Sequence, residues 1–501
     1  MYQPVIGLEI HIQLKTKSKM FCGCKTHDIS VKPNENVCPV CMGHPGVLPV
    51  PNEQAVRFGV LIGHALNCQI TVHSKFDRKN YFYPDLPKAY QISQFDLPIA
   101  KNGFLEITDP QNKENPYIKI GITRAHLEED AAKNIHDASG NTYIDFNRGG
   151  TPLVEIVTEP DFTCAHHTKI FLHELRLIAR YLNISSADME KGQLRCDANI
   201  SLRQIDDNGE IIGATFNPKT EIKNLNSFRH VERALEYEIK RQTKLWQAGT
   251  PPMEQSTRGW NESKQQTELQ RIKEDSDDYR YFPEPDIPPM DLTQMIEQVQ
   301  AELPELPAAR RARFVDEYEM RTEDAKQICD DPALADFVEA VFSELEAWLQ
   351  SVDDPEAHDK KKMAKLVSSW TITKLGGLLA ERSSDVRIMK VTPENFAELI
   401  TLIATGKLSQ SSALQVLNEM LEAGEDPSHI MEDKKLGRME DEGEIADVVD
   451  RVLEMNPNEV ERYKAGEKQL MKFFVGMIMK ETEGTADPGI AQNMLKVKLE
   501  K

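Results

Sequence analysis

The sequence predicts an α+β body followed by two all-α segments, and three observations lead to this fold class. Residues 1–282 are rich in β-branched residues, glycine and aromatics, and in several places they alternate between apolar and polar side chains, as strands do. The proline-rich stretch 283–289 can continue neither a helix nor a central strand. From Leu292 onward, apolar residues recur at a spacing of three to four, which is typical of amphipathic helices.

The length and charge of the chain limit its architecture and its partners. At about 100–200 residues per domain, the 501 residues are enough for two to four domains. Its 81 acidic residues outnumber its 60 basic residues, which gives a net charge of −21. Because an acidic surface repels a phosphate backbone, contacts with a nucleic acid would have to come from local basic patches.

Two features of the sequence bear on its location. No run of about 18 uncharged apolar residues is present, which argues against a transmembrane helix. Met1–Pro4 leads directly into a strand-like segment, without the charged and apolar regions of a signal peptide. We therefore expect a cytoplasmic protein with no membrane partner.

The first strand-like segment, Val5–Leu14, alternates strictly between polar and apolar residues. Glu9, His11 and Gln13 share one of its faces, and the opposite face is apolar. One interpretation is a half-exposed strand with a wet face. The other is a platform on which a carboxylate and an imidazole, two residues apart, hold a metal ion or a phosphate.

Two further segments carry acids on or next to strands. The segment 121–130 is dense in charge and contains Glu129, and in the segment 149–157 Glu155 shares a strand face with apolar residues. A charge-dense segment is usually a solvated surface. Glu155 lies either at a sheet edge or in a buried position, and a buried carboxylate would need a cation beside it.

Three acid-bearing strands could together form one metal site. Glu9, Glu129 and Glu155 would suit Mg²⁺, which prefers carboxylates plus substrate phosphates. His11 as a further ligand would also admit Mn²⁺. The sequence contains no Gly-x-x-x-x-Gly-Lys-Ser/Thr loop, which excludes a P-loop NTPase.

The cysteines predict a second metal site. In a chain without an export signal, clustered cysteines indicate metal binding before disulfides. Two close pairs fit a closed tetrahedral zinc knuckle. The alternatives are four free thiols in a loop, or a site in which His27 or His44 replaces one thiolate. The four clustered residues are Cys22, Cys24, Cys38 and Cys41.

Basic and aromatic residues interleave in the segments 75–85 and 88–94. This pattern suits a pocket for a phosphate and a stacked base, although an aromatic-rich loop packed on the body would explain it equally well. In the segment 195–203, a period of two places polar residues on one strand face. These residues are Arg195, Asp197, Asn199 and Ser201.

Taken together, these segments resemble the B subunit of the tRNA-dependent amidotransferases that make Gln-tRNA(Gln) or Asn-tRNA(Asn). The resemblance rests on long, specific strings that span nearly all of the first 290 residues, and it continues more weakly to Lys472–Gly476. The strings are residues 5–14, 75–96, 121–130, 147–161, 189–203, 221–242 and 271–286.

The resemblance implies a domain order and partners. A cradle-shaped catalytic domain similar to that of glutamine synthetase, built on an antiparallel sheet, would span residues 1–292. An all-α helical domain, 293–407, and an all-α tail domain that contacts tRNA, 408–501, would follow. The chain would work in a heterotrimer with an amidase (the A subunit) and a small third chain (the C subunit).

The resemblance also implies roles for individual residues. The Mg²⁺ ligands would be Glu9, His11, Glu129 and Glu155. Lys79 would be a catalytic cation. The pocket for ATP and substrate would contain Lys79, Asp197, Asn199, Glu221 and Lys223. Cys22, Cys24, Cys38 and Cys41 would hold a structural Zn²⁺.

The activity implied is that of a ligase that forms a C–N bond with glutamine as amido donor. This chain would use ATP to phosphorylate the side-chain carboxylate of mischarged Glu-tRNA(Gln) or Asp-tRNA(Asn), and ammonia from the amidase would displace the phosphate. The rival hypothesis is a non-catalytic, zinc-stabilised scaffold that positions tRNA for a partner enzyme. The tail departs from the family pattern, because acids at 466–468 and 483–487 stand in an expected basic stretch, which bears on its affinity for tRNA.

Overall fold

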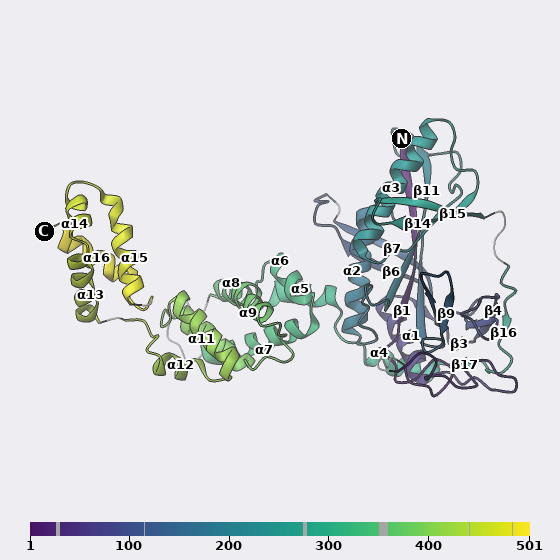
Figure 1. Ribbon diagram of the computed structural model, residues 1–501, viewed down its shortest axis with the longest axis horizontal. Coiled ribbons are helices and arrows are strands. Elements are labelled where there is room, and N and C mark those ends of the chain that lie inside the picture. The colour runs from purple at the N-terminus through teal and green to yellow at the C-terminus, as the bar shows by residue number, and fades with distance from the viewer. Residues whose placement is uncertain are drawn as a thin grey trace. The chain divides into compact units, whose positions relative to one another are not determined.

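The computed structural model describes residues 1–26, 31–114, 116–273, 278–349, 359–439, 441–482 and 484–500. The chain forms two compact units, Met1–Pro307 and Ala308–Lys501 (Figure 1). The first combines a large sheet with helices and the second is helical, which confirms the predicted order of α+β and all-α parts. Within the described ranges, no helix has the length and apolar character needed to cross a membrane.

A ten-stranded sheet forms the centre of the first unit. Its strands are β1 (Tyr2–Gln13), β2 (Gln69–Ile70), β6 (Ala100–Thr108), β7 (Tyr117–Glu129), β10 (Pro152–Thr158), β11 (Leu194–Ile205), β12 (Ile211–Ile212), β13 (Thr220–Lys223), β14 (Gln255–Asn261) and β15 (Gln266–Lys273). They lie in the order β15-β14-β13-β11-β1-β10-β7-β6-β2, and β12 pairs with β11. Among these strands only the β13–β14 pair is parallel. Figure 1 shows β14 and β15 running across the direction of β1, so the sheet is strongly twisted.

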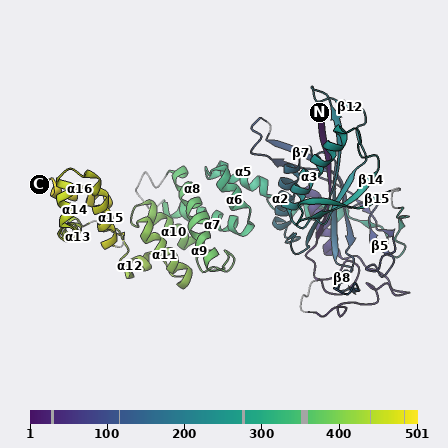
Figure 2. The ribbon, with the colours of Figure 1, turned by 45° about the horizontal axis from the view of Figure 1, so that its top comes forward.

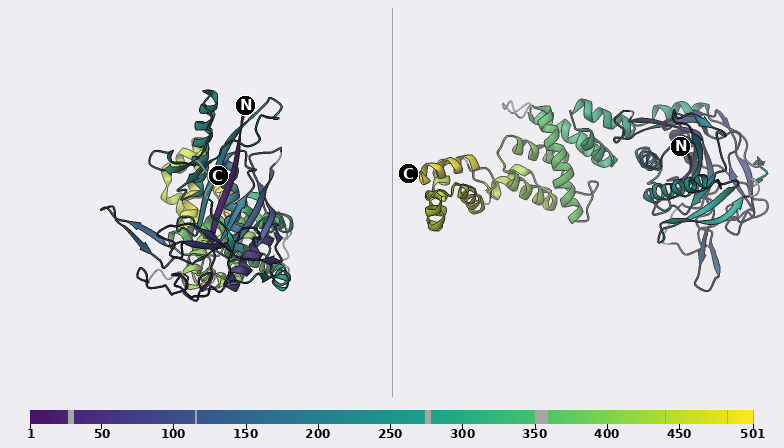
Figure 3. Two further views of the ribbon diagram at one scale, coloured as in Figure 1. Left: turned by 90° about the vertical axis from the view of Figure 1, so that its right-hand side faces the viewer. Right: turned by 90° about the horizontal axis from the view of Figure 1, so that it is seen from above.

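Three small sheets accompany the large one. They are β16-β4-β5, formed by Phe282–Pro283, Asp77–Asn80 and Tyr90–Ser93; β17-β3, formed by Met290–Asp291 and His73–Ser74; and the hairpin β8–β9, formed by Lys133–His136 and Thr142–Asp145. Both views of Figure 3 show the hairpin standing away from the rest of the unit. The proline-rich stretch is extended, as predicted, but it lies against the body through β16 and the buried Ile287.

Helices cover the apolar face of the large sheet. They are α1 (Glu53–Ala65), α2 (Ala165–Tyr181) and α3 (Phe228–Gln247), and Figure 2 shows α2 and α3 beside the strands. Leu8, Ile10 and Ile12 of β1 are fully buried in this core, as the strict alternation of the segment requires. Cutting such a side chain back to alanine costs about 2–5 kcal/mol.

The first unit extends beyond the boundary expected at residue 292. Helix α4 (Thr293–Ala301) packs on α1, and its Val299 belongs to the same core as the sheet. An ion pair of 2.5 Å between Arg57 of α1 and Glu302 links α1 to the C-terminal end of α4.

The second unit holds two hydrophobic cores. The first contains residues from Phe314 to Leu436 and the second residues from Ile445 to Leu499. The boundary expected at 407/408 therefore falls within the range of the first of these cores. The helices are α5 (Pro307–Glu317), α6 (Thr322–Cys329), α7 (Pro332–Leu349), α8 (Lys360–Ser369), the π-helix η1 (Trp370–Leu375), α9 (Gly376–Glu381), α10 (Pro393–Ala404), α11 (Gln410–Ala423), α12 (Pro427–Asp433), α13 (Glu442–Met455), α14 (Pro457–Lys464), the 3₁₀ helix η2 (Lys468–Leu470), α15 (Met471–Glu481) and α16 (Pro488–Leu499).

Candidate active site and metal centre

One face of the ten-stranded sheet is lined with polar side chains. The register sets His11 of β1 opposite Glu155 of β10 and Arg195 of β11, and it sets Glu155 opposite His126 of β7. Because directly paired residues lie on the same face of a sheet, these side chains and their period-two neighbours form one surface. The neighbours are Glu9, Arg124, Glu128, Asp197, Asn199, Glu221 and Lys223.

Two buried carboxylates and two imidazoles meet at the centre of this surface. His11 Nε2 lies 3.2 Å from Glu128 Oε1 and 3.4 Å from Glu155 Oε2. His126 Nε2 lies 3.1 Å from Glu155 Oε2 and 3.6 Å from Glu128 Oε2. Glu128 and Glu155 are only 2% and 7% exposed, so each needs the positive charge that a histidine or a metal ion provides.

The charges in this cluster stabilise one another. Burial lowers the pKa of His11, but the Glu155 and Glu128 carboxylates outweigh it and raise that pKa to about 10. Burial in turn favours the protonated forms of the two acids, and the histidines outweigh it, so the pKa values of Glu128 and Glu155 lie well below the usual range. The two acids are thus ionised at neutral pH, as metal ligands must be, whereas His11 has to give up its proton before its imidazole can bind a metal ion.

The donor set fits a hard or borderline divalent cation. One ligand atom each from His11, Glu128 and Glu155 lie within 4.8 Å of one another. Carboxylates suit Mg²⁺, and a single imidazole among them is compatible with Mn²⁺. Of the four ligands that the resemblance implies, the structure brings His11 and Glu155 together.

The other two expected ligands have different partners. Glu9 Oε1 accepts a hydrogen bond from Asn199 Nδ2, 2.9 Å away. Glu129 Oε1 accepts from the backbone N–H of Ile92 at 3.0 Å and forms an ion pair with Lys88. Neither acid belongs to the group of donors that lie within 4.8 Å of one another.

Sequence reasoning missed Glu128 and His126 as members of the cluster. The signal was present, because a period of two along β7 sets Arg124, His126 and Glu128 on the face that Glu129 avoids. What the segment alone could not give was its pairing with β10, which brings this face beside Glu155.

Lys79 of β4 lies among tyrosines near the carboxylates. Its Nζ is 4.7 Å from the ring centroid of Tyr279 and 6.0 Å from that of Tyr81. Burial lowers the pKa of Lys79, but Glu128, Tyr281 and Glu155 outweigh it and raise the pKa above its usual value. Lys79 is therefore a permanent cation facing the acidic cluster.

A segment far along the chain supplies two of these tyrosines. We call residues 278–286 the tyrosine strap. The side chain of Asn80 donates to the backbone carbonyls of Tyr279 and Arg280, at 3.3 and 2.7 Å. At the other end of the strap, Arg78 donates two hydrogen bonds of 2.7 and 2.8 Å to Glu284. Because Arg78, Lys79 and Asn80 are consecutive, the strand that carries Lys79 also fixes the strap.

Of the five residues expected in the nucleotide pocket, Asp197, Asn199, Glu221 and Lys223 lie on β11 and β13, whereas Lys79 lies on β4. Lys223 Nζ is 2.9 Å from Asp197 Oδ2 and 3.0 Å from Glu221 Oε1. Asn199 links this group to Glu9 through its hydrogen bond. A cavity of about 410 Å³ adjoins them. Its lining includes Glu9, Asn199, Ser201, Phe216 and Lys219.

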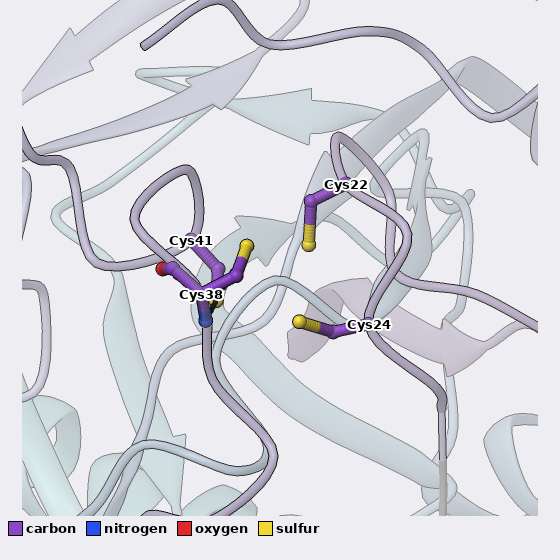
Figure 4. Close-up of side chains that lie close together, drawn as sticks. All are labelled: Cys22, Cys24, Cys38 and Cys41. Carbon is purple, nitrogen blue, oxygen red and sulfur yellow. Dashed lines mark hydrogen bonds between the residues drawn. The ribbon is translucent and has the colours of Figure 1, made fainter.

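The four clustered cysteines converge as their spacing predicts. Figure 4 shows the side chains of Cys22 and Cys24 approaching those of Cys38 and Cys41 from another part of the loop. The four sulfur atoms lie within 4.8 Å of one another. His44 is not part of this group, and His27 lies outside the described residues.

The close contact between the thiols shifts the pKa values of two of them. Contact between Cys22 and Cys41 lowers the pKa of Cys41 to about 4 and raises that of Cys22, and the N–H of Cys38 points to Cys41 Sγ at 3.2 Å. Four sulfurs at this spacing, one of them readily ionised, fit a closed Zn²⁺ site.

Two family models match this chain. The family model described as the GatB/GatE catalytic domain matches residues 4–298, and the model described as the GatB domain matches residues 355–499. The first match covers the sheet with its polar face and the cysteine cluster. The second covers most of the helical unit.

Individual proteins match along the whole chain. The proteins from Thermotoga maritima and Thermotoga neapolitana are 45% identical over 505 residues, which is 100% of this chain and 99% of each relative. The protein from Thermodesulfovibrio yellowstonii is 44% identical over 496 residues, covering 99% of this chain and 98% of its own. All three are named as the B subunit of aspartyl/glutamyl-tRNA(Asn/Gln) amidotransferase.

Proposed function

The chain belongs to the family of B subunits of aspartyl/glutamyl-tRNA(Asn/Gln) amidotransferase, and from this membership we propose that it carries out the ATP-dependent step of tRNA-dependent transamidation. The substrates are ATP and mischarged Glu-tRNA(Gln) or Asp-tRNA(Asn). The overall reaction joins carbon to nitrogen and takes its amide nitrogen from glutamine. The end products are Gln-tRNA(Gln) and Asn-tRNA(Asn).

The chemistry explains why ATP is needed. A carboxylate is a poor acyl donor at neutral pH, so ammonia does not displace its oxygen directly. Transfer of the γ-phosphoryl group to a side-chain carboxylate oxygen releases ADP and gives an acyl phosphate. Ammonia then attacks the acyl carbon, inorganic phosphate leaves, and the amide forms. The first of these steps is the one we assign to this chain.

The polar face of the sheet supports that assignment. His11, Glu128 and Glu155 are the residues that would hold Mg²⁺ or Mn²⁺. When bound, the ion supplies positive charge to the oxygens of the transferring phosphoryl group. Lys79 adds a fixed cation that would orient phosphate and carboxylate oxygens in front of the cluster.

The wider ligand set implied by the resemblance remains a second hypothesis. It includes Glu9 and Glu129 together with His11 and Glu155. In the set we favour, Glu9 orders the nucleotide side of the site through Asn199. Glu129 holds Lys88, whose side chain is 8% exposed.

We place the nucleotide along β11 and β13. Asp197, Glu221 and Lys223 form one charged group there. The adjoining cavity of about 410 Å³ offers a 63% exposed Phe216 ring for stacking and the ammonium of Lys219 for a phosphate.

Other chains would complete the reaction. The amidase, or A subunit, would release ammonia from glutamine, and the small C subunit would complete a heterotrimer that acts in the cytoplasm. The helical unit would contact the tRNA. The four cysteines would hold a structural Zn²⁺, which stabilises the loop after β1 and takes no part in the chemistry.

The observation that carries the proposal is the convergence of His11, Glu128, Glu155 and Lys79 on one place. A scaffold that only positions tRNA for another enzyme has no use for two buried acids in contact with an imidazole, nor for a lysine whose pKa those acids raise. The test is ATP breakdown by the assembled complex. We expect it only with mischarged tRNA, whereas equal breakdown with correctly charged tRNA, or none at all, would favour the scaffold.

A further inference from the structure

Lys19 is a buried cation beside the cysteine cluster. It lies in the loop after β1 with 1% of its surface exposed. Its Nζ donates to the carbonyl of Asn36 at 2.9 Å and lies 3.8 Å from Cys41 Sγ. Among the described residues, no carboxylate forms an ion pair with it, although a buried charge is costly unless an opposite charge lies beside it.

We propose that Lys19 is a positioning residue of the zinc site, whose ammonium is the counter-charge of the cysteine cluster and strengthens its hold on Zn²⁺. Four thiolates around one divalent ion leave an excess of negative charge. An ammonium that donates to one of the sulfurs reduces that excess and fixes the position of the sulfur. This inference rests on the proposed Zn²⁺ site and does not depend on the proposed reaction.

Lys19 also connects the cysteine cluster to the sheet, through its backbone and its side chain. Its backbone N–H donates to the carbonyl of Cys24 at 2.8 Å, and the N–H of Met20 donates to the carbonyl of Gly150 at 2.7 Å. Gly150 has a φ of +85°, and a Cβ built on it would lie 3.4 Å from Lys19 Cδ and 3.7 Å from Cys41 Cβ.

The loop at Gly150 leads to the acidic cluster. The N–H of Gly150 donates to the carbonyl of Asp130 at 2.9 Å, directly after β7, and two residues later β10 begins. These are the strands of Glu128 and Glu155. Lys19 thus lies between the cysteine cluster and the ends of these two strands.

The test compares two lysines in the full-length protein. Lys19→Met keeps the apolar stem and removes the buried charge. Lys17→Met makes the same change in net charge at an exposed position two residues away. Affinity for Zn²⁺ is measured by competition with a chromophoric chelator, and the absorption bands of the Co²⁺-loaded protein report on the sulfur donors.

We expect Lys19→Met to weaken Zn²⁺ binding by about 10- to 100-fold, the usual effect of losing a group that supports a metal ligand. It should also shift the thiolate-to-cobalt bands, and Lys17→Met should change neither. Wild-type affinity and an unchanged spectrum for Lys19→Met would overturn the proposal.

A second measurement distinguishes a loss of the contact between Lys19 and Cys41 from a general loss of stability in Lys19→Met. Lys19→Met is compared in the wild-type and in the Cys41→Ser background, by the denaturant midpoint of unfolding. If the sulfur is the partner of the ammonium, the substitution lowers the midpoint less when Cys41 is already absent. An equal shift in both backgrounds would contradict the inference.

Discussion

Glu128 and Glu129 are neighbours in the sequence, but their carboxylates have different surroundings. Glu128 contacts His11 and His126 on the polar face, whereas Glu129 pairs with Lys88. Consecutive side chains of a strand point to opposite faces, so the two acids cannot serve the same ion from regular strand positions. If the proposed function is right, a change at Glu128 should affect catalysis and a change at Glu129 should affect stability.

We expect Glu128→Gln to lower the rate of acyl phosphate formation by about 100-fold or more, because an amide leaves the metal-binding group without one of its charges. Glu129→Gln should instead lower the free energy of unfolding by roughly 1–3 kcal/mol, because the buried Lys88 loses its partner. Trapping the acyl phosphate with hydroxylamine and unfolding both variants in urea measures the two effects. A Glu129→Gln variant of normal stability that cannot phosphorylate, beside an active Glu128→Gln, would favour the wider ligand set.

At the scale of elements, local patterns predicted some features and missed others. The alternation of Val5–Leu14 predicted the polar and apolar faces of β1, and the cysteine spacing predicted that the four thiols lie close together. The tyrosine strap was missed as part of the site. No period in residues 278–286 indicates that the chain returns to β4, because this contact depends on side chains such as Arg78 and Asn80 meeting a distant segment.

The strap gives a prediction about Lys79. Tyr279→Leu removes the aromatic face under the ammonium, an interaction worth about 0.5–2 kcal/mol, so kcat should fall about 2- to 30-fold. Tyr279→Phe keeps the ring and should retain most of the activity. Tyr83→Leu, at a position that is 61% exposed, is the control. Steady-state kinetics of the assembled complex gives the answer, and a Tyr279→Leu variant with the kcat of the control would exclude a role for the ring in positioning Lys79.

At the scale of the whole molecule, the hydrophobic cores show where the chain can be truncated without opening a core. Composition predicted a body and a helical remainder, but the boundary expected at 407/408 falls within the range of a core. Leu408, Ala413 and Val416 belong to the same hydrophobic core as Phe314. Sequence periodicity shows which face of a helix is apolar and does not show which other helices cover it.

Two truncations test this division. Removing residues 441–501 takes away the last core as a whole, so the thermal unfolding of the rest should keep its midpoint. Removing residues 408–501 opens the preceding core and should lower that midpoint by several degrees. The shorter deletion should also raise the KM for mischarged tRNA and weaken its salt dependence, since phosphate contacts make affinity depend on salt. Identical melting of the two truncated proteins would show that residues 308–407 fold without α11.

The central claim, that this chain transfers phosphate to a carboxylate, has a direct test. The side-chain carboxylate of Glu-tRNA(Gln) is prepared with an isotopic oxygen label, and the assembled complex converts it with ATP and glutamine. If the carboxylate attacks the γ-phosphorus, one labelled oxygen must leave with each phosphate when ammonia displaces it. We predict labelled inorganic phosphate in proportion to the amide formed. Unlabelled phosphate would show that water attacks the phosphorus, and it would contradict the proposed function.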